Sequence, residues 1–161
     1  MPENEASAAS LLQLIWLASP ALPVGGFSYS EGLEAAVELA GLNSEQAAAD
    51  WLADQLHLSL ARGDLAVVAQ AMAAWEAGDR ERIAQLNAWV LHTRESAEFV
   101  LQTVQMGHSF VEWLKLHHAD AADIFAAGRE PAAYPVAFPN AAQRAGASVR
   151  VGCLTFAFGG A

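Results

Sequence analysis

A recurring pattern, in which a glycine is followed by a residue that can cap a helix, divides the sequence into segments. It occurs at Gly41 with Asn43 or Ser44, at Gly63 with Asp64, and at Gly78 with Asp79. Glycine readily ends a helix in the left-handed conformation, and Asp, Asn and Ser accept hydrogen bonds from the first amides of the next helix. The segments between these points carry apolar residues at helical spacing, so the pattern predicts helices joined by tight turns.

We therefore predict an all-α fold, a single-domain helical bundle, with residues 10–128 overwhelmingly helical. Hydrophobic residues make up 54% of the chain, enough for a sizeable core, and alanine, the best helix former, dominates them. No alternating strand-like run occurs before residue 149. The breaks are expected near Pro20–Phe27, Gly41–Asn43, Gly63 and Gly78. A long helical stretch from Arg80 to His118 is expected to kink near Thr93 or Gly107, and a short helix at 121–127 follows.

The N-terminal region combines a polar leader with an apolar helix. Residues 1–9 are interpreted as a flexible leader. Ser10 is positioned to cap a helix from Leu11 to Ala18, whose apolar residues occur almost all round. A helix of this kind is expected to be buried.

The loop that follows is both rigid and apolar. Two prolines and two adjacent glycines forbid a continuous helix between Ser19 and Phe27. Loops are ordinarily solvated, so the apolar side chains in this one predict that it packs against other parts of the protein. They are Leu22, Val24 and Phe27. Ser28 and Glu31 have the spacing of a capping box, which predicts that a helix restarts at Ser28.

The C-terminal segment has a different composition. Tyr134–Phe138 is apolar, Pro139-Asn140 interrupts it, and VRVGCLTFAFGGA at 149–161 contains three glycines and lacks an amphipathic helical period. We therefore predict that residues 139–161 form an irregular, atypical tail.

Charge and cysteine content limit the classes of partner and the compartment. The net charge of −10 disfavours binding to nucleic acid and to anionic membranes. The single cysteine, Cys153, cannot form an intramolecular disulfide, which fits a reducing compartment. The apolar stretch before Pro20 is too short to span a bilayer and lacks a basic flank. The expected location is the cytoplasm.

Motifs for catalysis are missing from the sequence. It contains neither GxxxxGK[ST] nor GxGxxG, and Ser28 follows Gly-Gly-Phe rather than lying in a GxSxG elbow. Helix capping explains Ser28 with fewer assumptions than a nucleophile does. We predict a protein that is not an enzyme and holds no cofactor; a degenerate helical enzyme is an alternative.

The histidines and tryptophans allow a second interpretation. His57, His92, His108, His117 and His118 are scattered and form no HExxH pair, so no metal site is predicted. The alternative function is a helical metal-binding or sensor module that uses these histidines.

The tryptophans are expected to be core or interface anchors: Trp51, Trp75, Trp89 and Trp113. Arg94, Glu95 and Glu98 are interpreted either as solvated helix charges or as a buried or interface network.

Three segments resemble the urease accessory protein UreF family. The first is LLQL at 11–14 with SPALPVGGFSYSEGLE at 19–34; the second is Thr93-Arg94-Glu95 with Gln-Met-Gly at 105–107; the third is YPVAF at 134–138. Their order and spacing also match, so we assign residues 10–138 to one UreF-like helical domain. Residues 139–161 depart from the amphipathic helices with which the family continues, so the chain resembles a C-terminally truncated or altered member.

The resemblance implies an accessory protein with no catalysis of its own. It implies a homodimer that bridges the UreD (or UreH) protein and the GTPase UreG and regulates the GTPase step. The complex would insert nickel into apo-urease.

The first of these segments supplies the candidate contacts. Rigid apolar anchors beside carboxylates suit an interface with an apolar centre and a charged rim. The partner-binding candidates are Pro23, Val24, Gly25, Gly26, Phe27, Tyr29, Glu31 and Glu34.

Overall fold

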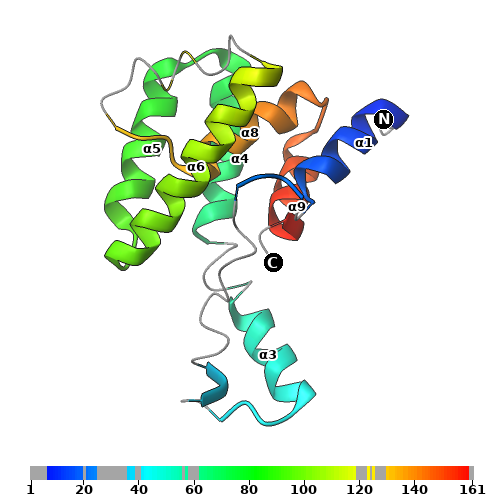
Figure 1. Ribbon diagram of the computed structural model, residues 1–161, viewed down its shortest axis with the longest axis vertical. Helices are drawn as coiled ribbons and strands as arrows, with labels where there is room; N and C mark the ends of the chain where they lie inside the picture. The colour runs from blue at the N-terminus through cyan, green and yellow to red at the C-terminus, as the bar shows by residue number, and fades with distance from the viewer. Residues whose placement is uncertain are drawn as a thin grey trace.

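The computed structural model describes residues 7–19, 21–24, 36–38, 41–55, 57, 62–118, 123, 125 and 130–159. Within these ranges the regular structure is helical and no strand occurs, which confirms the all-α prediction. The main helices are α1 (Ala8–Leu17), α3 (Glu45–Gln55), α4 (Asp64–Ala77), α5 (Arg80–Thr93), α6 (Ala97–His117), α8 (Tyr134–Arg144) and α9 (Val149–Gly159). Figure 1 shows α4, α5, α6 and α8 packed together, α1 beside α9, and α3 projecting away from this bundle.

Helix α8 is the centre of the bundle. Every residue from 132 to 142 is buried, and α8 packs most extensively on α4 and α6. An aromatic cluster surrounds it: Phe110 of α6 lies 5.6 Å from Tyr134 and 6.1 Å from Phe138 between ring centroids. Phe156 of α9 lies 5.3 Å from Phe138. The apolar segment at 134–138 is therefore the core of the molecule.

The predicted irregular tail at 139–161 is wrong for the described residues. Helix α8 continues through Pro139 to Arg144, and α9 occupies Val149–Gly159. The residues read as helix breakers have other roles. Pro139 is fully buried within α8, and Gly152 lies against the Met72 side chain of α4, where a Cβ would come 2.4 Å from Met72 Sδ. Burial on several neighbouring helices thus overrides the weak local helix propensity.

The predicted helix ends are partly confirmed. Gly78 has φ 65° and Asp79 accepts a hydrogen bond from the Arg82 amide at 2.9 Å, as the glycine-and-cap pattern predicts. Ser44 accepts from the Ala47 amide at 3.2 Å. Asp64, however, is the first residue of α4 and not its cap. The stretch predicted as one kinked helix is two helices, α5 and α6, separated at residues 94–96, and no break occurs at residue 107.

Helix α1 differs from its prediction in start and in burial. It begins at Ala8, and its cap is Ser7, whose hydroxyl accepts from the Ser10 amide at 3.1 Å. Leu14 and Leu17 are buried, whereas several apolar residues predicted to be buried are exposed: Leu11, Leu12, Ile15 and Trp16. One face of α1 covers the bundle and the other faces solvent.

The segment that leads into α8 is held by a buried asparagine of α5. Asn87 donates to the Pro131 carbonyl at 2.9 Å and accepts from the Ala133 amide at 2.7 Å. On the other side, Gly107 of α6 allows the Ala132 carbonyl to approach the helix backbone. These contacts fix where the central helix begins.

Candidate protein-interaction surface

The chain turns sharply after α1, and short-range hydrogen bonds close the turn. The Leu22 amide donates to the Ser19 carbonyl at 2.9 Å, and the Val24 amide donates to the Leu22 carbonyl at 2.7 Å. The Ser19 hydroxyl accepts from the Ala21 amide at 3.1 Å. A turn closed in this way retains little backbone freedom, so little entropy would be lost if it bound a partner.

The same turn is anchored in the core. Leu22 is only 2% exposed and belongs to the main core cluster, and Val24 is half-buried against that cluster. The predicted packing of these two side chains is confirmed. Pro23 between them is exposed. The remaining loop and helix candidates lie outside the described residues: Gly25, Gly26, Phe27, Ser28, Tyr29, Glu31 and Glu34.

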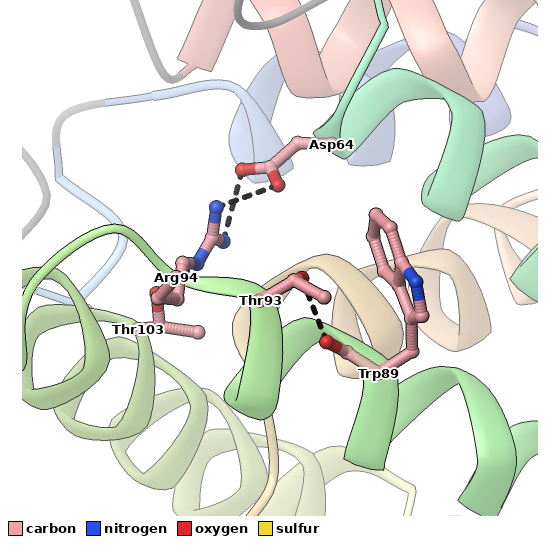
Figure 2. Close-up of polar contacts among 5 residues, drawn as sticks. All are labelled: Asp64, Trp89, Thr93, Arg94 and Thr103. Atoms are coloured by element: carbon pink, nitrogen blue, oxygen red, sulfur yellow. Dashed lines mark hydrogen bonds and ion pairs between the residues drawn. The ribbon is translucent and has the colours of Figure 1, made fainter.

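A second polar site lies at the junction of α4, α5 and α6. The Arg94 guanidinium donates to both carboxylate oxygens of Asp64, at 2.9 and 3.1 Å, and its Nε donates to the Thr103 hydroxyl at 2.9 Å (Figure 2). The Arg94 and Asp64 side chains are each 22% exposed. The network interpretation is therefore correct for Arg94 alone, and its carboxylate partner is Asp64; Glu95 and Glu98 are exposed. Sequence reasoning missed this pair because Asp64 fitted the pattern of a cap.

The tryptophans divide between core and surface. Trp75 is buried, and its indole N–H donates to the Val136 carbonyl at 2.9 Å. Trp113 is partly buried against the core. Trp89 is 51% exposed, and its backbone carbonyl accepts a hydrogen bond from the Thr93 hydroxyl at 2.7 Å (Figure 2). Exposed tryptophan is a common anchor of protein interfaces, so Trp89 is a further candidate contact.

Two of the histidines in the described structure, His117 and His118, contact the same ring, that of Trp113. His117 ends α6, as predicted, and stacks on Trp113 with 4.5 Å between ring centroids. His92 lies 3.0 Å from Glu130. Within the described ranges, no group of three His, Cys, Asp or Glu side chains could hold a metal ion.

Cys153 is a half-buried thiol on α9. Its sulfur lies 3.8 Å from the Leu65 carbonyl oxygen. Burial raises the pKa of the Cys153 thiol, which disfavours the reactive thiolate. The arrangement suits packing rather than nucleophilic chemistry.

Comparison with known proteins places the chain in a family. The family model UreF matches residues 42–161. A protein of Polaromonas sp. (strain JS666 / ATCC BAA-500) with the name "Urease accessory protein UreF" is 60% identical over 159 residues, which are 98% of this chain and 68% of that protein. The protein of the same name from Paracidovorax citrulli (strain AAC00-1) is 62% identical over 94% of this chain and 62% of its own length.

The chain belongs to the UreF family of urease accessory proteins. The family match extends through residue 161, so the region of α8 and α9 is part of it and the reading of residues 139–161 as atypical is wrong. The chain spans roughly two thirds of the length of these UreF relatives. Within the described ranges, none of the helices has the length and hydropathy that a membrane span requires.

Proposed function

We propose that this UreF-family chain is a non-catalytic adaptor of urease maturation in the cytoplasm. It would bind a UreD/UreH-like protein, recruit a UreG-like GTPase and regulate its GTPase step, while nickel, the cargo, is inserted into apo-urease. A homodimer is part of this proposal. The family match over 42–161 carries it, because the closely similar relatives bear the name of urease accessory proteins.

The turn at Ser19–Val24 supports a docking role for the adjoining segment. Leu22 and Val24 fix it to the core, and Pro23 between them is exposed. A contact segment attached in this way would keep its orientation before binding, which lowers the entropic cost of association. We propose that residues 23–29, with Glu31 and Glu34, form the contact with the UreD/UreH-like partner.

Charge reversal at these two glutamates tests the proposed contact. We expect the double variant Glu31→Lys with Glu34→Lys to lose the UreD/UreH-like partner in a pull-down while staying folded, because rim charges act on association more than on folding. Its melting temperature should fall only by the small amount that loss of the predicted Glu31 cap explains. The matched control is Glu76→Lys with Glu81→Lys, which changes the net charge equally at exposed positions of α4 and α5. Unchanged binding by the first variant would move the interface elsewhere, and equal losses by both variants would indicate only a net-charge effect.

A further inference from the structure

Helix α9 presents an apolar face that the bundle leaves uncovered. Val151, Leu154 and Phe158 are 37%, 61% and 80% exposed. Together with exposed Arg150 they lie on one side of the helix, since residues four apart are neighbours on a helix surface. The opposite side, with Gly152, Thr155 and Phe156, is buried. Apolar side chains grouped in this way mark an interaction surface more often than isolated ones do.

The exposed face of α9 carries one basic side chain, Arg150, and no acidic one, although the chain as a whole is acidic. From residue 131 to residue 161 the sequence contains Arg144 and Arg150 and no Asp or Glu. Helix α1, which packs on α9, has no charged residue. A partner helix that combines apolar and acidic residues would match this face in both respects.

Helix α3 has this composition. It carries Glu45, Asp50 and Asp54 and no basic residue. Ala48, Trp51 and Leu52 form an apolar stripe at helical spacing, and Glu45 and Asp54 lie along its two edges. None of the described side chains of α3 is buried, Leu52 is 46% exposed, and Figure 1 shows the helix apart from the bundle.

We propose that α3 of one copy of this chain packs on the α9 face of a second copy. A two-fold symmetric pair would form the contact twice, because each copy supplies one acidic helix and one basic apolar face. Trp51 and Leu52 would lie against Leu154 and Phe158, with Arg150 beside the carboxylates. The inference rests on the homodimer of the proposed function and assigns its surfaces.

Mass measurements across a concentration series test the contact on the intact chain. Leu52→Asp and Phe158→Asp should each raise the dimer dissociation constant by roughly tenfold or more, as expected when an apolar anchor of an interface is lost. The matched control is Leu116→Asp, which places the same charge on α6 at a side chain that is 83% exposed. The substituted positions are exposed, so circular dichroism should show unchanged helicity. A chain that is monomeric at all concentrations, or equal weakening by the control, would overturn the proposal.

The proposed pairing of Arg150 with the carboxylates of α3 is tested separately, first by reversing one charge and then by restoring the pairing. Arg150→Glu should weaken the dimer, and combining it in the same chain with Glu45→Arg and Asp54→Arg should restore at least half of the lost stability of the dimer. Failure of the rescue while the apolar variants still dissociate the dimer would contradict the charge pairing.

Disulfide trapping identifies the copy to which α3 binds. In a Cys153→Ser background, Leu52→Cys and Leu154→Cys are placed in separately tagged chains, mixed and oxidised. We expect cross-links between the two tags and none when Ala84→Cys of α5 replaces Leu154→Cys. A disulfide closed within one chain that carries both cysteines, with no cross-link between tags, would show α3 binding its own copy and overturn the proposal. Pull-down of the UreD/UreH-like partner by a monomeric variant tests the adaptor function separately.

Discussion

At the scale of single residues, Gly107 shows how one missing side chain permits the packing of the core. A Cβ at this position would lie 1.9 Å from the Ala132 carbonyl oxygen and 2.8 Å from its carbon. These are backbone atoms of the segment that Asn87 holds from the other side, so they cannot move away independently. Gly107 lies inside α6, where its conformation is ordinary, and its role is therefore close approach and not a turn.

We predict that Gly107→Ala destabilises the protein by about 1–3 kcal/mol, because overpacking exceeds the gain of up to about 1 kcal/mol that alanine gives in a helix. Chemical denaturation measures the difference. Gly152→Ala is the matched comparison, since its new methyl group would meet the end of the flexible Met72 side chain. It should cost less than Gly107→Ala, and the reverse order would contradict this account of the two glycines.

Ionisation of Tyr134 makes the stability of the core depend on pH in the alkaline range. Burial raises the pKa of the Tyr134 phenol, so the folded protein resists its ionisation. The contribution of this protonated phenol to the free energy of unfolding is fully present below the unfolded pKa of about 10. It is lost as pH rises towards the folded pKa, by at most about 1.4 kcal/mol per pH unit. Tyr134→Phe should flatten the fall in unfolding free energy above pH 10. An unchanged slope would show that Tyr134 does not contribute.

At the scale of the elements, the position of α8 depends on the clamp at residues 131–133. Replacing Asn87 with alanine removes two hydrogen bonds and leaves the Ala133 amide without this partner in a buried region. We predict a loss of about 1–3 kcal/mol for Asn87→Ala. Gln85→Ala, at an exposed position of the same helix, should stay within about 0.5 kcal/mol of the wild type in urea denaturation. Equal effects of the two substitutions would argue against the clamp.

Local signals predicted some elements well and others poorly. The turn at Gly78 and Asp79 was predicted correctly, because a left-handed glycine and a side-chain cap depend only on residues that are close in sequence. Helix α8 was missed because Pro139 suggests a break, whereas burial on several neighbouring helices outweighs that local signal. The partner of Arg94 was missed as well, since Asp64 is 30 residues away in sequence and only the fold brings them together.

At the scale of the whole molecule, the core helix α8 is surrounded by other helices, and the proposed contact surfaces lie at the margin of this bundle. The turn at Ser19–Val24 was recognised in the sequence because its composition is unusual, and its attachment to the core is confirmed for Leu22 and Val24. The uncovered face of α9 could not be predicted, since its helix was not. The family assignment came from motif order and spacing, which composition and periodicity alone do not supply.

In the proposed adaptor role this chain joins two other proteins, and the mass of the assembled complex tests that role. Purified UreD/UreH-like and UreG-like proteins are mixed with and without this chain and analysed by size exclusion with light scattering. We predict a complex that contains all three proteins only when the chain is present, and its loss with Glu31→Lys and Glu34→Lys. Association of the two partners to the same extent without the chain, or no binding of the chain to either, would contradict the adaptor role.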